Sequence, residues 1–226
     1  MWGDFPISPD GSFRHYLPVD ANRVEMVEAP RALAVAALAV SPFPVVYLHL
    51  SSGGTISPVQ NTISDYVSVS GGTWLLGFTA LALAVGSIAL LVGMVRSGLP
   101  RRGPVAVLIG LWAAGLAVVA VFPTDPVGAP TSVTGLVHRY AGAVMFASLP
   151  IAGWLVSRAF LPSPLLRRLS ILAGFASGAF MLSHTAVLGA GSGLVLLGLF
   201  ERVLFVVLYA LLFTLAAALS RREGTS

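Results

Sequence analysis

The hydrophobic positions of this chain fall into six long runs, and short segments between the runs carry most of the polar residues. Each run holds about 20 mainly apolar residues, enough for a helix that rises about 1.5 Å per residue to cross about 30 Å of hydrocarbon. Because lipid offers backbone groups no hydrogen-bond partner, each run is predicted to be a helix rather than an open strand. The pattern predicts an all-α integral membrane bundle with six transmembrane helices, at 32–50, 73–95, 105–122, 136–157, 170–190 and 200–219.

The arginines between the runs predict the orientation of the bundle. Eight of them lie in the segments 96–104, 158–169 and 220–226, whereas none lies in 51–72, 123–135 or 191–199. Basic residues near the ends of membrane spans stay cytoplasmic. Both termini are therefore expected in the cytoplasm, as a polar N-terminal arm (1–31) and a short cytoplasmic tail (220–226). The arm has no apolar stretch typical of a signal peptide, so we expect the first span to direct insertion.

Prolines and glycines inside the runs predict local features of the helices. Pro42, Pro44 and Pro150 each remove a backbone donor and are expected to kink or unwind their helices. The Gly-x-x-x-Gly formed by Gly174 and Gly178 is typical of helices that approach each other closely.

The connecting segments carry two further patterns. In 51–72, Ser57 can cap a short surface helix near 58–67, which would put Val59, Ile63 and Tyr66 on one face. The two Arg-rich connections, RSGLPRRGP and RAFLPSPLLRR, share a Leu-Pro pair and paired arginines. This similarity is consistent with a duplication and also with ordinary turn chemistry.

Composition narrows the class of protein. Hydrophobic residues make up 56% of the chain and charged residues 10%, with a mean hydropathy of +0.89, whereas about a quarter of a soluble domain is charged. So few charges exclude a cytosolic enzyme, a disordered protein and a nucleic-acid-binding domain. The chain has no cysteine, which excludes disulfides and thiolate metal sites. We expect a multi-pass protein of the plasma (inner) membrane of a bacterium, with the lipid bilayer as its partner.

Ionisable residues in or near the spans are costly to bury, so they are the first candidates for a functional site. In the predicted topology they all fall in the outer half of the bundle. The predicted ligand-binding set is Asp65, Asp125, His138, Arg139, His184, Glu201 and Arg202.

Each of these residues also has a purely structural interpretation. Asp65 could cap the surface helix, and Asp125, which precedes Pro126, could form a turn through its side chain. Arg139 and Glu201 could form an ion pair between two spans. His138 and His184 could bond to neighbouring helices, and His49, at the interface, is expected to be hydrated.

Four segments carry a resemblance to a known family: NTISDYVSVSGG, LLGFTALALAVGS, VFPTDP and GLVHRYAGAVMFASLPIAGWL. Over residues 34–219 the chain resembles the bacterial and archaeal membrane proteins of "domain of unknown function 998". The resemblance implies six spans in this order, and it adds weight to Asp65, Asp125 and His138, which lie in its most specific motifs. It implies no activity.

Several functions are compatible with these residues. The first hypothesis is an outward-facing polar pocket that binds a lipid headgroup or small molecule, with proton-coupled transport as an extension. The second is a metal-dependent hydrolase in which His138, His184, Asp65 and Asp125 supply ligands to a zinc-like ion. The third is an electron-transfer protein with a haem held between His138 and His184, and the fourth is a scaffold without a ligand. No cofactor motif is assigned, and a non-enzymatic role is favoured.

Overall fold

Every regular element of the computed structural model is a helix over the residues that it describes, which are 21–126, 128–190 and 196–223, with 21–28, 186–190 and 223 described as backbone only. Its elements are α1 (Ala21–Val40), α2 (Phe43–Ser51), the 3₁₀ helix η1 (Ile63–Ser68), α3 (Gly72–Arg96), α4 (Pro104–Val121), α5 (Val133–Ala159), α6 (Pro164–Ala190) and α7 (Leu197–Glu223). Six helical segments in this part are long and apolar enough to cross a membrane, and α1 and α2 together form the first. The predicted six-span all-α bundle is confirmed.

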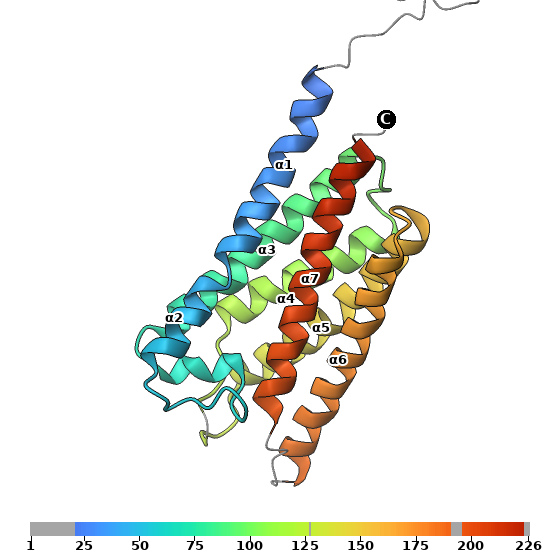
Figure 1. Ribbon diagram of the computed structural model, residues 1–226. Coiled ribbons are helices and arrows are strands. Elements are labelled where there is room, and N and C mark those ends of the chain that lie inside the picture. Colours follow the sequence, from blue (N-terminus) through green and yellow to red (C-terminus); the bar gives the residue numbers. More distant parts are fainter. Residues whose placement is uncertain (1–20, 127, 191–195, 224–226) are drawn as a thin grey trace, which may run out of the picture.

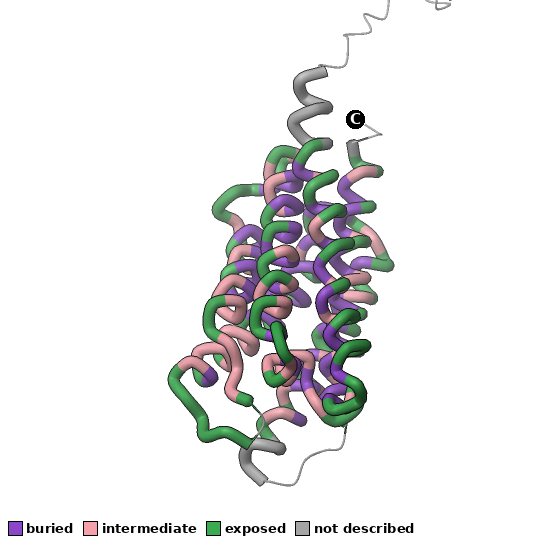
Figure 2. The backbone as a smooth tube through the Cα atoms, turned by 90° about the vertical axis from the view of Figure 1, so that its left-hand side faces the viewer, coloured by how far each residue is buried: buried purple, intermediate pink, exposed green. Residues whose placement is uncertain are grey.

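The helices form one bundle in which successive spans lie side by side (Figure 1). The last helix, α7, also contacts α1, α3 and α5. Its residues Leu204, Leu211 and Leu215 are fully buried and lie on one helical face. Figure 2 shows exposed residues along the sides of the bundle, and many of these are large and apolar, such as Trp74 and Phe175. An apolar lateral surface of this kind fits a lipid environment.

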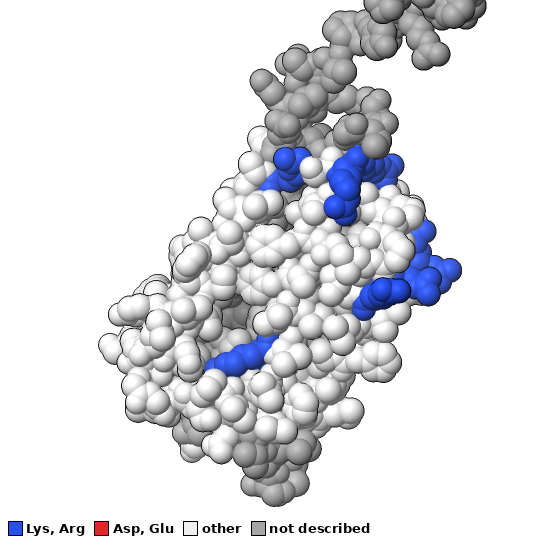
Figure 3. Space-filling view, in the orientation of Figure 1, with Lys and Arg blue, Asp and Glu red and all other residues white. Residues whose placement is uncertain are grey.

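The two ends of the bundle differ in charge. Helix α1 begins and α7 ends at the same end (Figure 1), and basic side chains gather there on the face shown in Figure 3. We call this the basic end, and define it by Arg96, Arg101, Arg102, Arg158, Arg167, Arg168, Arg221 and Arg222. The opposite end, which holds the connections 52–71 and 122–132, is called the loop end.

The helix breaks predicted at Pro42 and at Pro150 have different outcomes. The first span is interrupted at Ser41 and Pro42, as predicted. Pro42 cannot donate to the carbonyl of Leu38, and the hydroxyl of Ser41 donates to that carbonyl instead, at 2.9 Å. The same hydroxyl bonds Tyr209 on α7 at 2.6 Å, which ties the break to the bundle.

Helix α5, by contrast, continues through Pro150 without interruption. Pro150 has no N–H to donate to the carbonyl of Phe146. The hydroxyl of Ser177 on α6 donates to this carbonyl instead, at 2.9 Å. A neighbouring helix thus satisfies the group that the proline leaves unpaired.

Close helix packing occurs at glycines other than the predicted pair. A Cβ atom at Gly178 would meet nothing within 4 Å, and one at Gly174 would meet only Pro150 at 4.0 Å. Within the described bundle neither glycine lies at a close helix contact, and both are exposed. At Gly115 and Gly153 a Cβ atom would come within 3.0 Å of α5 and α6 respectively, so these glycines set the helix spacing.

Two predicted boundaries change. The predicted polar arm is helical from Ala21 onward, so α1 starts inside it, and residues 1–20 lie outside the described residues. The surface helix begins at Ile63 rather than at Pro58. Ser57 caps a single turn, in which its hydroxyl accepts the backbone N–H of Gln60 at 3.3 Å and its carbonyl accepts that of Asn61 at 2.8 Å. The chain then extends at Thr62 before η1 starts.

Candidate functional site

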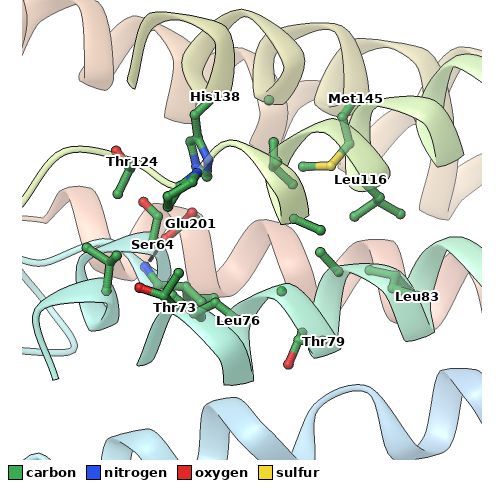
Figure 4. Close-up of a pocket in the computed structure, with 18 of the residues that line it drawn as sticks. Ser64, Thr73, Leu76, Thr79, Leu83, Leu116, Thr124, His138, Met145 and Glu201 are labelled. Atoms are coloured by element: carbon green, nitrogen blue, oxygen red, sulfur yellow. Dashed lines mark hydrogen bonds between the residues drawn. The ribbon is translucent and has the colours of Figure 1, made fainter. Parts of the chain in front are cut away.

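A cavity of about 110 Å³ lies within the loop-end half of the bundle, between α3, α4, α5 and α7 and beside η1. Most of its wall is apolar and includes Leu76, Leu83, Leu116, Val119, Met145 and Phe205. Figure 4 shows that polar side chains gather at one end, from Ser64, Thr73, Thr124, His138 and Glu201, while Leu83, Leu116 and Met145 lie at the other. The cavity is therefore amphipathic along its length.

Glu201 brings a carboxyl group into this cavity from the beginning of α7. Its side chain is buried, with 6% of the residue exposed. The backbone N–H of Ile63, the first residue of η1, donates a hydrogen bond to Oε2 of Glu201. Since a buried carboxyl group needs hydrogen-bond partners, this bond both satisfies Glu201 in part and fixes η1 against α7.

His138 enters the same polar end from the second turn of α5. Its Nδ1 donates to the carbonyl of Phe122 at 2.8 Å. A neutral imidazole that donates through Nδ1 keeps its lone pair on Nε2. In Figure 4 the ring points toward Glu201 and Ser64, so the structure brings these two predicted site residues, His138 and Glu201, to one cavity.

The cavity lies inside the segment that a family comparison identifies. A family model described as "Protein of unknown function (DUF998)" matches residues 33–218. The chain belongs to the DUF998 family. This confirms the resemblance found in the sequence motifs, and every residue that lines the cavity of this DUF998 protein lies within the match. Comparisons with curated proteins and with solved structures gave no match.

Arg202 of the DUF998 chain anchors the loop-end connection instead of lining the cavity. Its Nη1 donates to the carbonyls of Asn61 at 2.8 Å and Gly198 at 3.0 Å, and its Nη2 donates to the hydroxyl of Tyr66 at 3.3 Å. That hydroxyl also bonds Nδ1 of His49 at 2.8 Å. The histidine that we expected to be hydrated therefore belongs to a network that holds the 52–71 connection to α7.

Asp65 lies at the same connection and caps η1. Its Oδ2 accepts the backbone N–H of Thr62 at 2.7 Å, and the two residues form a capping box. Asp65 does not line the cavity. The contacts of Asp65 therefore support its structural interpretation as a helix cap.

Asp125 and Arg139 meet at the start of α5. The two carboxylate oxygens of Asp125 accept the hydroxyl of Ser132 at 2.5 Å and its backbone N–H at 3.1 Å. Arg139 lies 4.0 Å from the same carboxylate. The expected pair between Arg139 and Glu201 is therefore wrong: two turns of α5 bring Arg139 back to the connection that precedes the helix.

The hydrogen bonds from Ser132, helped by the charge of Arg139, hold the pKa of Asp125 below its ordinary value of 3.8. A carboxyl group with a lowered pKa in the folded protein stabilises the fold above its unfolded pKa, and this contribution is lost as the pH falls through the folded value. We therefore expect Asp125→Asn to lower the unfolding temperature in detergent at neutral pH. The difference from wild type should shrink as the pH falls below about 4.

The variant Ser132→Ala tests whether the hydrogen bonds from Ser132 cause the lowered pKa of Asp125. Ser132→Ala removes the main donor to Asp125 and also the N-cap bond that the Ser132 hydroxyl accepts from the N–H of Gly135 at 3.0 Å. The double variant should therefore lose little more stability than Ser132→Ala alone. A stability difference that stays constant down to the lowest pH would contradict the assignment.

His184 lies apart from the cavity. Its ring packs against that of Phe180, with centroids 5.8 Å apart, and its Nδ1 is buried without a hydrogen-bond partner in the described part of the chain. Across the described ranges no three His, Asp or Glu side chains are grouped as metal ligands would be. The metal and haem hypotheses for His138 and His184 stay predictions.

Sequence reasoning did not find the hydroxyl groups of the cavity. Thr73 and Thr124 carry no signal beyond their proximity to span ends, and Ser64 is distinguished in the sequence only as the neighbour of Asp65 in the motif NTISDYVSVSGG. Thr79 also lines the wall, and its buried hydroxyl has no partner among the described residues. Figure 4 shows that this hydroxyl points away from His138 and Glu201, so Thr79 is not part of the polar end.

Proposed function

We propose that this DUF998 protein binds a small amphipathic molecule inside the bundle. The polar head of the ligand would lie between Glu201 and His138, and its apolar part would extend toward Leu83, Leu116 and Met145. The observation that carries the proposal is a buried carboxyl group and an imidazole at one end of a cavity whose remaining wall is apolar. Ligand sites in helical bundles are commonly built in this way, from a mainly apolar cavity with a few polar groups.

The two polar side chains favour a head group that donates hydrogen bonds. The carboxyl group of Glu201 offers acceptor oxygens in either protonation state, and a neutral His138 that donates to Phe122 presents an acceptor at Nε2. A ligand that carries an amino or hydroxyl group would satisfy both.

The volume favours a short apolar segment. The cavity of about 110 Å³ is smaller than an apolar cavity of about 150 Å³ that is known to bind benzene. The proposed ligand is therefore a short-chain amphiphile, or the terminal portion of a longer one.

Binding is a simpler role for this site than transport. Between the cavity and the basic end, the buried hydroxyl of Ser87 donates to the carbonyl of Leu83 at 2.8 Å and that of Ser170 donates to Leu166 at 2.7 Å, each within its own helix. These groups offer no continuous polar path. If the basic end is cytoplasmic, as its arginines favour, the polar end of the cavity faces outward in a plasma membrane.

Native mass spectrometry of the purified protein tests the proposal, with Glu201→Gln as the site variant. Wild type should retain a small molecule that bears an amino or hydroxyl group. Glu201→Gln keeps a carbonyl acceptor for Ile63 but replaces the second carboxyl oxygen with an amide donor, and an unsatisfied buried polar group costs about 1–3 kcal/mol. We therefore expect the occupancy of this variant to fall about tenfold.

Asp125→Asn is the matched control, because it removes the same charge at the same end of the bundle but outside the cavity. It should retain the ligand at the wild-type level. A bare wild-type protein, or equal retention by Glu201→Gln, would contradict the proposal. A retained metal ion or haem would favour the enzyme or electron-transfer hypotheses instead.

A further inference from the structure

Helices α5 and α6 run antiparallel, and two contacts between them define their register. The hydroxyl of Ser177 donates to the carbonyl of Phe146 at 2.9 Å. One turn further toward the basic end, a Cβ atom at Gly174 would lie 4.0 Å from Cβ of Pro150. The same register places the last turn of α5 beside the first turn of α6, at the basic end.

The outer faces of these two helices meet on the flank of the bundle. Each face consists of exposed residues spaced three, four or seven apart, which lie on one side of a helix. The faces adjoin because Gly174, an exposed residue of α6, lies next to Pro150 of α5. We call the line along which they meet the α5–α6 seam, and define it by Ala147, Trp154 and Arg158 of α5 and Arg167, Ile171, Gly174 and Gly178 of α6.

The middle of the seam is open. A Cβ atom at Gly178 would meet nothing within 4 Å, and one at Gly174 would meet only Pro150. Ala147, which the register brings near Gly178, is also small and exposed. The exposed ring of Phe175 projects from α6 beside the two glycines. Small residues next to large exposed side chains leave a shallow apolar channel that one acyl chain can occupy.

Two arginines stand at the basic end of the seam, Arg158 in the last turn of α5 and Arg167 in the first turn of α6. Both are exposed, and no carboxylate among the described side chains pairs with either. The guanidinium of Arg158 lies 5.1 Å from the centre of the Trp154 ring, and a guanidinium stacked on a ring keeps its N–H groups for hydrogen bonds. Figure 3 shows basic side chains on the flank of the bundle beside the α5–α6 connection. The seam therefore joins a positive end to an apolar channel.

We propose that the α5–α6 seam binds an anionic phospholipid, with its phosphate between Arg158 and Arg167 and an acyl chain along Gly174 and Gly178. Guanidinium groups pair with phosphate through two parallel hydrogen bonds. Basic sites between transmembrane helices at the cytoplasmic side are suited to anionic headgroups, and tryptophan is typical of the headgroup level. The seam shares no residue with the amphiphile cavity of the proposed function, so this inference stands apart from that function.

A second copy of the chain is the other occupant that an exposed Gly-x-x-x-Gly face can take. In a symmetric dimer across this face the two copies have the same orientation in the membrane, so their arginines would meet at the basic end. The carboxylates among the described side chains, Asp65, Asp125 and Glu201, lie toward the loop end. Four guanidinium groups would therefore face one another without a counter-charge from the described residues, and they would repel. The charge of the seam favours a lipid phosphate.

The test titrates the delipidated full-length protein with phosphatidylglycerol or phosphatidylcholine of identical acyl chains, and counts bound lipid by native mass spectrometry. Wild type should bind phosphatidylglycerol at least about tenfold more tightly than phosphatidylcholine. The double variant Arg158→Gln/Arg167→Gln should lose about tenfold or more of the phosphatidylglycerol affinity. Arg101→Gln/Arg102→Gln is the matched control, because it removes the same charge at the same end from the connection between α3 and α4, and it should bind like wild type.

The variant Gly178→Leu tests the channel with both arginines in place. Its side chain would occupy open space in the seam, and leucine favours a helix over glycine. The variant should therefore weaken phosphatidylglycerol binding without lowering the unfolding temperature. Gly110→Leu adds the same side chain to α4, also in open space but outside the seam, and should bind like wild type.

Four results would overturn the lipid site. Equal losses in the two arginine variants would indicate diffuse charge attraction, and equal binding of the two lipids would show that the phosphate charge is not recognised. Displacement of the lipid by millimolar inorganic phosphate would indicate a free-phosphate site. A wild-type dimer that Gly178→Leu converts to a monomer would assign the seam to a second copy of the chain.

Discussion

Gly198→Ala is expected to release the 52–71 connection from α7. A Cβ atom at this position would lie 2.1 Å from the carbonyl oxygen of Asn61 and 2.8 Å from that of Pro58. Both atoms belong to the backbone, so the connection itself must move. The hydrogen bond from the backbone N–H of Leu199 to the carbonyl of Val59, at 3.1 Å, would be lost with it. Overpacking together with lost hydrogen bonds should cost about 3 kcal/mol of stability.

Two measurements check this expectation. The unfolding temperature in detergent should fall, and chymotrypsin should cleave after Tyr66, which is fully buried in the folded protein. Gly110→Ala is the control, because a Cβ atom there meets nothing within 4 Å. That variant should be neutral or more stable by up to about 1 kcal/mol, since alanine favours the helix. Equal cleavage of the two variants would show that the connection is not docked through Gly198.

Gly142→Leu is expected to abolish ligand retention without unfolding the bundle. Gly142 lies on α5 and lines the amphiphile cavity, and a Cβ atom there meets nothing within 4 Å. A leucine side chain would therefore enter the open space and occupy much of its volume. Leucine also favours a helix by close to 1 kcal/mol over glycine, so the variant should fold at least as stably as wild type. The occupancy measured by native mass spectrometry should fall by an order of magnitude or more.

Gly110→Leu is the matched control for this change. It adds the same side chain to a helix interior, in open space that is not part of the cavity. It should retain the ligand. Equal retention by both variants would place the retained molecule elsewhere on the protein.

The sequence predicts the spans well because the physical requirement is strong and local. About 20 apolar residues must follow one another to cross the membrane, and each run can be counted without knowledge of its neighbours. The interruption at Pro42 follows in the same way from a missing donor. Pro150 behaves differently because a distant residue, Ser177, supplies the donor, and no local pattern contains that information.

The sequence predicts the site only in outline. The position of each ionisable residue along its span places the predicted ligand-binding residues near one end of the bundle. The depth of a residue in the membrane does not determine which neighbouring helix or cavity its side chain faces. His138 and Glu201 face the same cavity, whereas His184 packs against Phe180 instead. Asp65 and Asp125 had recognisable local roles, since Thr62 and Ser132 lie within seven residues of them and supply the donors.

The loop-end connection links stability to the proposed site. Arg202 holds this connection through Asn61, and the neighbouring Glu201 holds it through Ile63. These two adjacent residues of α7 therefore have different roles. Arg202 fixes the connection, whereas the carboxyl group of Glu201 both supports the connection and faces the cavity. Variants of Arg202 should therefore be assessed for folding before any change in ligand binding is interpreted.

The most direct test of the amphiphile cavity is to photolabel the wild-type protein in lipid nanodiscs with a short-chain alcohol that carries a diazirine, and to map the labelled residues by peptide mass spectrometry. The proposed function predicts labels at Leu83, Leu116 and Met145, which an excess of the unlabelled alcohol suppresses. Labels confined to side chains exposed on the flanks of the bundle, such as Phe175 and Leu182, and insensitive to the unlabelled alcohol, would contradict it.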